Sequence, residues 1–95
     1  MKPLKRHSER ITYIANFMEA ARGQKSLKTL DTGRKHIWAD LGSIENPQVR
    51  KTAQDLFRST MSVAESVERK SPDDLGQTLL DGLQDLVEFL EAEDC

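Results

Sequence analysis

The two histidines and the single cysteine are the side chains that could support metal or acid–base chemistry in this 95-residue chain. His7 and Glu9 form an H-x-E pair, the beginning of a zinc deaminase signature, but no P-C-x-x-C segment follows. His36 and Cys95 are far from this pair in the sequence, so the ligand spacing of a zinc site is missing. We therefore predict no metal site and no cofactor.

A catalytic site is not indicated either. His36 could act as a base only if a partner acid and a pocket converged on it, and so short a chain has little surface to form one. The glycines are dispersed and form neither a G-x-G-x-x-G nor a G-K-[ST] phosphate loop. We predict no catalytic residue and expect that the protein is not an enzyme.

Acidic residues near the end of the chain form the most distinct charged surface. Residues 71–95 contain eight Asp or Glu and no Lys or Arg. On a helix, four of them fall within an arc of about 60°, opposite the leucines: Asp74, Asp81, Asp85 and Glu88. This acidic face is either a solvated surface, a surface that meets a basic partner, or an imitation of nucleic-acid phosphates. The charge can also be neutralised within the chain or across a dimer.

Basic residues are concentrated at the other end. Residues 1–36 contain nine Lys or Arg against three Asp or Glu, and the candidate basic patch consists of Lys5, Arg6, Arg10, Lys28 and Lys35. Such a patch could follow a phosphate backbone, although the turn at Gly23 and Gln24 fits a helix-turn-helix only loosely. Nucleic-acid binding is therefore the alternative function.

The stretch 71–93 must position the acids, and its pattern predicts a helix over about 72–92. Ser71 is the expected N-cap, Pro72 suits the first position, and Asp74 is placed for a capping box. At 100° per residue its apolar side chains cover an arc of about 180°, wider than the stripe of an ordinary surface helix. They are Leu75, Leu79, Leu80, Leu83, Leu86, Val87, Phe89 and Leu90.

Three further helices are expected, over about 8–22, 25–42 and 47–70. Ser8 and Asn46 are the expected N-caps, and Pro47 marks the start of the third. The segment 25–42 is ambiguous because Gly33 and Arg34 interrupt its apolar stripe: either the helix breaks near this point, or Arg34 reaches out along its apolar stem. The last two helices should form a hairpin.

The predicted fold is therefore all-α: a small antiparallel bundle of three to four helices with a long C-terminal helical hairpin. Residues 1–7 are expected to be a flexible basic arm and 8–95 a single helical domain. The expected core is Ile11, Ile14, Met18, Leu27, Leu30, Ile37, Trp38, Leu41, Val49, Leu56, Phe57, Val63, Val67, Leu79, Leu83, Leu86 and Leu90.

These patterns favour a non-enzymatic protein-interaction module, such as a small chaperone, adaptor or inhibitor. No apolar run has the length of a membrane span and no signal peptide is recognised, so we expect a cytoplasmic protein. The wide leucine arc also predicts a homodimer, with Gly76 allowing close approach; the alternative is a monomer in which the first two helices cover the arc. The candidate partner or dimer interface is Leu79, Leu80, Leu83, Val87 and Leu90.

Overall fold

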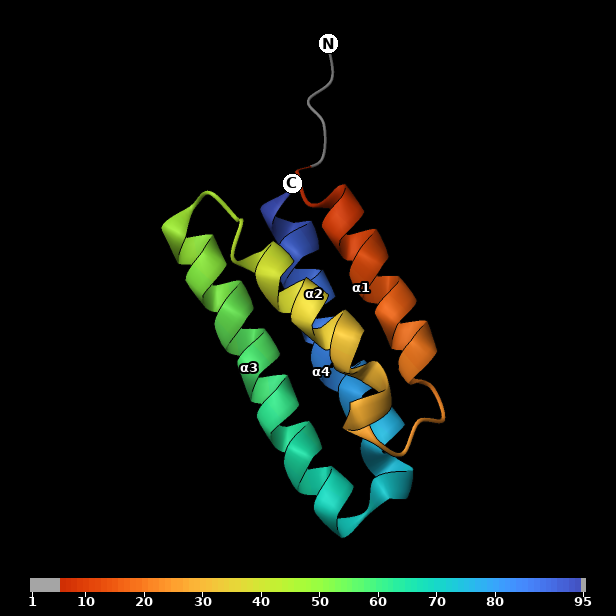
Figure 1. The fold of residues 1–95 in the computed structure, drawn as a ribbon. Coiled ribbons are helices and arrows are strands. Elements are labelled where there is room, and N and C mark those ends of the chain that lie inside the picture. The colour runs from red at the N-terminus through yellow and green to blue at the C-terminus, as the bar shows by residue number, and fades with distance from the viewer. Residues whose placement is uncertain (1–5, 95) are drawn as a thin grey trace.

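Four α-helices and two 3-10 turns make up residues 6–94, the part of the chain that the computed structural model describes (Figure 1). In chain order they are α1 (Ser8–Ala21), η1 (Leu27–Leu30), α2 (Asp31–Leu41), α3 (Pro47–Lys70), η2 (Pro72–Asp74) and α4 (Leu75–Glu93). No strand occurs among these residues, which confirms the predicted all-α bundle with a C-terminal hairpin. None of the helices described is long and apolar enough to cross a membrane.

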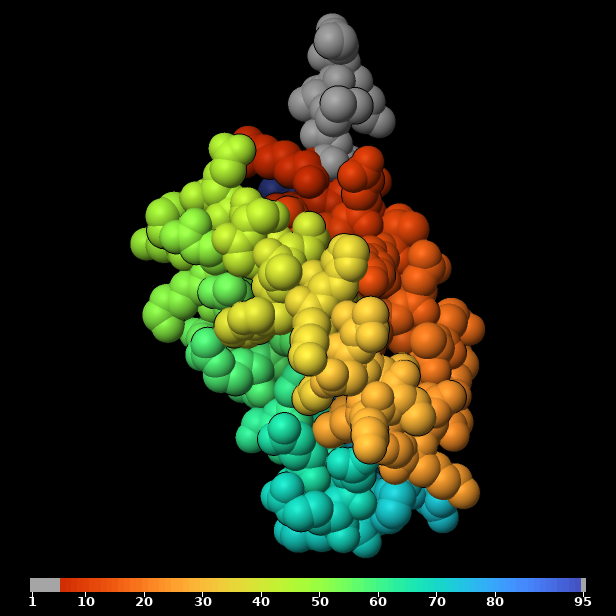
Figure 2. Space-filling model, viewed as in Figure 1, coloured from red at the N-terminus to blue at the C-terminus, as the bar shows by residue number. Residues whose placement is uncertain are grey.

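The helices are arranged around α4. α3 and α1 both pack along it, and α2 lies on the opposite side of the core, between α1 and α3 (Figure 1). The space-filling view shows α2 on the surface, with α3 on one side and α1 on the other (Figure 2). The Tyr13 and His36 rings meet edge to face with centroids 4.4 Å apart and so join α1 to α2.

Two of the expected helix boundaries follow directly from local chemistry. The Asn46 side chain accepts hydrogen bonds from the backbone N–H groups of Gln48 (2.9 Å) and Val49 (3.1 Å), so Asn46 caps α3 as predicted. Gly23 follows the end of α1 with φ +74°, a conformation in which a glycine costs little.

The starts of α1 and α4 differ from the expectation. α1 already includes Ser8 as its first residue, since the carbonyl of His7 accepts a bond from the N–H of Ile11 (2.8 Å). α4 begins three residues later than predicted, after the turn η2. The backbone N–H of Ser71 is bonded to Val67 (2.6 Å), so Asp74 instead accepts a bond from the Ser71 hydroxyl (2.8 Å) and no capping box forms.

The ambiguous segment 25–42 is not one helix. It divides into η1 and α2, which meet at Leu30 and Asp31. Gly33 lies inside α2, where a Cβ would come 2.7 Å from the Phe17 ring of α1. Gly33 therefore allows close packing between α1 and α2, and it is not the point where the helix ends.

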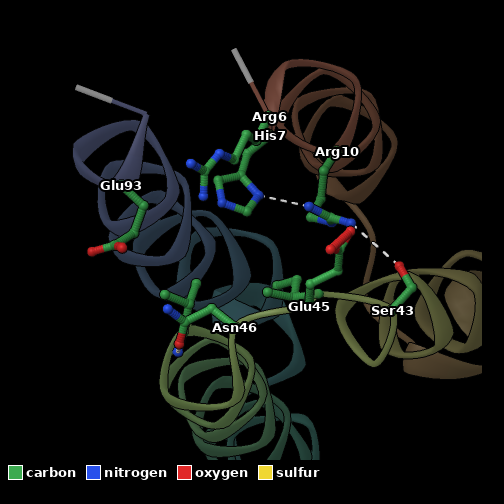
Figure 3. A pocket seen from close by; sticks show the side chains of 9 residues that line it. Arg6, His7, Arg10, Ser43, Glu45, Asn46 and Glu93 are labelled. Atoms are coloured by element: carbon green, nitrogen blue, oxygen red, sulfur yellow. Dashed lines mark hydrogen bonds between the residues drawn. The ribbon is translucent and has the colours of Figure 1, made fainter. Parts of the chain in front are cut away.

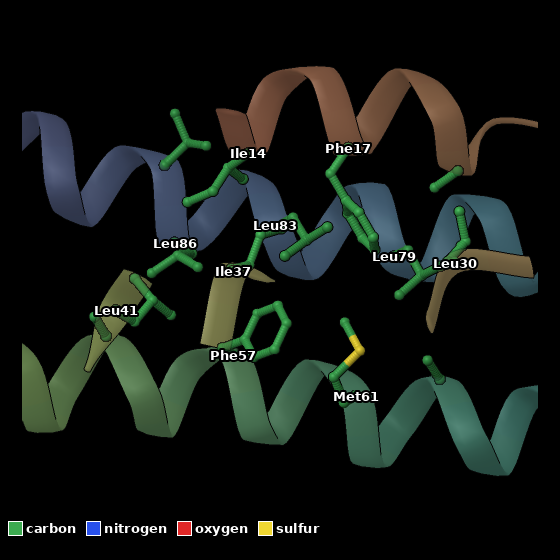
Figure 4. Packing of buried hydrophobic residues seen from close by; sticks show 14 of the residues in the cluster. Ile14, Phe17, Leu30, Ile37, Leu41, Phe57, Met61, Leu79, Leu83 and Leu86 are labelled. Atoms are coloured by element: carbon green, nitrogen blue, oxygen red, sulfur yellow. The ribbon is translucent and has the colours of Figure 1, made fainter. Parts of the chain in front are cut away.

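The core lies between all four helices (Figure 4). Its most enclosed side chains, with at most 1% exposure, include Ile14 of α1, Ile37 and Leu41 of α2, and Leu75, Leu79, Leu83, Leu86 and Leu90 of α4. Phe57 and Met61 reach it from α3, and Ile44 from the α2–α3 connection. Most of the core thus belongs to residues whose helical spacing predicted it.

Two predicted core residues are on the surface. Trp38 is 36% exposed and Val63 is 53% exposed. Val63 faces away because α3 buries the stripe that includes Thr60, Met61 and Ala64. Trp38 follows the buried Ile37 by one residue, about 100° around the short helix α2, and this turns its ring to the edge of the core. Others pack only partly buried at the margin: Ile11, Met18, Val49, Leu56 and Val67.

Candidate functional site

A groove runs between α2 and α3 on the face shown in Figure 2, where α2 is yellow and α3 is green. It has a volume of about 330 Å³. Six residues line it, three from each helix: Arg34, Lys35 and Trp38, and Phe57, Arg58 and Met61. A second hollow, described below, is polar, whereas this groove has an apolar floor.

The floor of the groove is apolar. Phe57 (2% exposed) and Met61 (8% exposed) are core residues of α3 whose outer surfaces the groove reaches. The Trp38 ring forms a wall and lies 6.3 Å from the Phe57 ring, at an interplanar angle of 31°. An exposed tryptophan beside a buried phenylalanine gives a rigid apolar surface that needs little ordering on binding.

Cationic side chains surround this floor. The guanidinium carbon of Arg58 lies 5.1 Å from the centroid of the Trp38 ring, a cation–π distance, and Arg58 also reaches Asp55 at 3.4 Å. Arg34 on the other helix donates to Asp31 at 2.6 Å, and its second terminal nitrogen is 4.0 Å from Glu65 of α3. Of the two alternatives for the segment 25–42, a break in the helix is the one observed, and Arg34 lies within α2 with its side chain 26% exposed.

Asp31 pairs with two of these cations. It accepts from Arg34 and lies 3.0 Å from the ammonium of Lys35, and these bonds lower the pKa of its carboxyl, with the Arg34 bond as the larger cause. Asp31 is also the first residue of α2, where a negative charge is favoured by the helix dipole. Asp31 therefore fixes Arg34 at the inner edge of the groove.

A second, polar hollow of about 440 Å³ lies where the start of α1 approaches the end of α4 (Figure 3). Arg10 is its central residue: Nε bonds Asp40 (2.8 Å), Nη1 lies 2.6 Å from Nδ1 of His7, and Nη2 bonds the Ser43 hydroxyl (3.3 Å). The backbone N–H of His7 donates to the Asp94 carboxylate (3.2 Å). Each guanidinium nitrogen of Arg10 therefore has a partner within the chain, and the cluster joins α1, α2 and the end of α4.

Burial lowers the pKa of His7, which is 6% exposed, and the Arg10 charge acts in the same direction while Asp94 opposes it. A neutral ring suits the geometry, because Nδ1 must accept from Arg10. His7 belongs to the H-x-E pair that the sequence analysis rejected as a zinc signature. Among residues 6–94, no group of three or more His, Cys, Asp or Glu side chains is placed to hold a metal ion.

The leucines expected to meet a partner are largely enclosed by the chain itself. Leu79, Leu83 and Leu90 have 0% exposure and Val87 has 8%, while Leu80 is half-buried. A Cβ on Gly76 would lie 3.0 Å from the carbonyl oxygen of Ala21, so this glycine admits the end of α1. The physical reason for expecting a dimer, an arc too wide for one chain to cover, therefore does not hold.

The predicted acidic face does lie on the outside. Asp74, Asp81, Asp85 and Glu88 are all exposed along η2 and α4. Gln77 donates to Asp81 (2.8 Å) and Gln84 to Glu88 (3.2 Å), each one turn apart on the same helix. Both bonds are made by polar side chains of the same helix.

The predicted basic patch is not one surface. Arg6 and Arg10 are at the polar hollow, Lys28 is in η1 toward the other end of α1, and Lys35 lies on the rim of the groove (Figure 1). Lys5 lies outside the described residues. Of the predicted patch, Lys35 alone contributes to the groove among the residues described.

Sequence reasoning missed the groove because it assigned Trp38 and Phe57 to the core and did not select Arg58 or Met61. The one available signal was Arg34, a charged residue within an apolar stripe. No protein-family model, curated protein or solved structure matches this chain, so its function must be argued from the groove itself.

Proposed function

We propose that the protein is a non-enzymatic interaction module that binds a partner protein through the groove between α2 and α3. The observation that carries the proposal is Trp38, which is 36% exposed and stands over an apolar floor; among residues 6–94, Val63 is the other exposed large apolar side chain. An adaptor, a small chaperone or an inhibitor would act in this way.

The geometry supports an anchor-type contact. A groove of about 330 Å³ has room for one or two apolar side chains of a partner, which would contact Trp38, Phe57 and Met61. Tryptophan and arginine are the residue types that most often dominate binding energy at protein interfaces, and both are present here. Six lining residues make a small contact surface, which favours a transient complex over a permanent one.

The test compares two surface substitutions. The purified chain, its Trp38→Ala variant and its Val63→Ala variant are immobilised and used to capture proteins from the source cell, with quantification by mass spectrometry. We expect at least one captured protein that Trp38→Ala loses and Val63→Ala keeps, and that binds the purified chain directly. Identical capture by all three chains would reject the groove as the binding surface.

Nucleic-acid binding is the second candidate, since a base could stack on Trp38 between Lys35 and Arg58. The cation–π position of Arg58 over the ring and the apolar floor favour the protein partner. Titration of labelled single- and double-stranded DNA and RNA at two salt concentrations separates the two. Steeply salt-dependent binding that is lost on substituting Lys35 and Arg58 would support the nucleic acid.

A further inference from the structure

We infer that the segment held by the groove is an acidic segment of another protein, with one apolar anchor residue and carboxylates on both sides of it. This inference rests on the proposed function and adds the chemistry of the partner. It is carried by the distribution of charge around the groove.

The charged residues that line the groove are all cations. Arg34 and Lys35 come from α2 and Arg58 comes from α3, so positive charge stands on both sides of the apolar floor. The acids that pair with them are Asp31, Asp55 and Glu65, and none of these lines the groove. An anchor seated on the floor is therefore surrounded by cations, and flanking acids are favoured over flanking bases.

Arg58 and Lys35 are the two residues best placed to select those acids. The side chain of Arg58 is 66% exposed and that of Lys35 is 78% exposed, so both can turn N–H groups toward a ligand while keeping their stems on the protein. The 3.4 Å contact of Arg58 with Asp55 is long for a charged hydrogen bond. A partner carboxylate can compete for Arg58 while the guanidinium remains over the Trp38 ring.

Arg34 has a different part. Its side chain is 26% exposed and its 2.6 Å bond to Asp31 fixes it at the inner edge of the groove. The three cations together thus place one fixed and two mobile charges around the bound residue.

The chain's own acidic face does not have the required anchor. On α4, the acids Asp81, Asp85 and Glu88 are exposed, while the leucines of that helix are buried in the core, except Leu80, which is half-buried. A second copy of the chain would bring carboxylates to the groove and leave the apolar floor empty. This is why a different protein is assigned as the occupant.

Peptide selection tests the inference without a known partner. Random displayed peptides of about twelve residues, roughly the length of a three-turn helix, are selected on the immobilised chain after removal of all binders to Trp38→Ala. We expect enriched sequences with a Leu, Ile, Phe or Trp anchor and an excess of Asp and Glu on both sides of it. Enriched anchors without an acidic excess, or with a basic excess, would overturn the inference and leave the proposed function standing.

A lack of any enrichment over the Trp38→Ala variant would overturn both the inference and the proposed function. The strongest selected peptide, labelled with a fluorophore, is then titrated with Lys35→Gln, Arg58→Gln and the control Lys25→Gln. Lys25 is a matched control because it is also exposed and also paired, to Asp73 at the far end of the bundle.

We expect each groove substitution to weaken binding by about two- to fivefold and Lys25→Gln to leave it unchanged. Raising NaCl from about 0.1 M to about 1 M shortens the Debye length from about 10 Å to about 3 Å. This should weaken the wild-type complex and have less effect on the complex of a variant that carries both Lys35→Gln and Arg58→Gln. Equal affinities for all variants at both salt concentrations would contradict charge selection. Tighter binding of an oligothymidylate than of the peptide would identify nucleic acid as the occupant.

Discussion

Thr60 of α3 occupies the space that a side chain at Gly82 of α4 would need. A Cβ built on Gly82 would lie 2.9 Å from the Cβ of Thr60 and still closer to its hydroxyl and methyl groups. The Thr60 hydroxyl donates to the carbonyl of Leu56 (2.9 Å), so its rotamer is held. Gly82 therefore allows α4 to pack closely against Thr60 of α3.

Gly82→Ala should therefore destabilise the protein, although alanine is the better helix former. The propensity gain is about 1 kcal/mol, and overpacking typically costs about 1–3 kcal/mol. We expect a net loss of about 1 kcal/mol in the free energy of unfolding, measured by urea denaturation. Thr60→Ala removes the two closest atoms but keeps the Cβ at 2.9 Å, so the double variant should recover part of the loss. A Gly82→Ala protein more stable than wild type would show that the helices are free to move apart.

Two leucines on α4 provide a matched pair for testing the core. Leu83 has 0% exposure whereas Leu80 is half-buried. Leu83→Ala should cost about 2–5 kcal/mol through lost transfer energy and a cavity, and Leu80→Ala about 1 kcal/mol. Chemical denaturation of both variants gives the comparison. Similar costs at the two positions would mean that the described packing of α4 is wrong.

His7 should make stability depend on pH. Its pKa is lowered in the folded state, so between that value and the unfolded value of 6.5 the unfolded chain binds more protons. The stability from neutral His7 is therefore complete above pH 6.5 and is lost as the pH falls toward the lowered pKa. We expect thermal unfolding to show this loss in wild type.

The control for this prediction is His7→Gln, which keeps a polar side chain but has no titratable group at this position. The difference in stability between wild type and His7→Gln should change below pH 6.5 and stay constant above it. Arg10, Asp94, Glu93 and Arg6 all act on the His7 charge, with burial as the largest cause. A constant difference over the whole range would indicate that His7 is accessible to protons without cost.

Sedimentation equilibrium at tens of micromolar should give a mass near 10.8 kDa. The reason is that Leu79, Leu83 and Leu90 are already enclosed within one chain. A mass of twice that value would contradict this expectation. If Trp38→Ala then halved it, the groove would be a contact between copies, and the proposal of a different protein partner would fail.

Local signals were sufficient for most of the fold. Asn46 and Pro47 mark the start of α3 through side-chain and backbone chemistry that involves neighbouring residues only. The leucine spacing of α4 likewise depends on helix geometry alone. Two expectations were wrong: Ser8 as the N-cap of the first helix, and Pro72 as the start of the last α-helix. Both depend on which backbone groups are already bonded elsewhere, and periodicity does not report that.

The site required information that the sequence pattern does not contain. Periodicity shows which residues share a face, but whether Trp38 is covered depends on how far α2, an 11-residue helix, extends between α1 and α3. The polar cluster around Arg10 was even harder to predict from the sequence, because His7 and Asp94 are 87 positions apart. A contact over that separation leaves no periodic signal in one sequence.

The contact between His7 and Asp94 also determines how the molecule would respond to mechanical force. It places the start of α1 beside the end of α4, two helices that run in opposite directions (Figure 1). A force applied at these two residues would break the contacts between α1 and α4 one after another, starting at the end where His7 and Asp94 meet. Optical-tweezer experiments with handles at positions 7 and 94 should give lower rupture forces than handles at 7 and 71, which load α1 and α3 along their length.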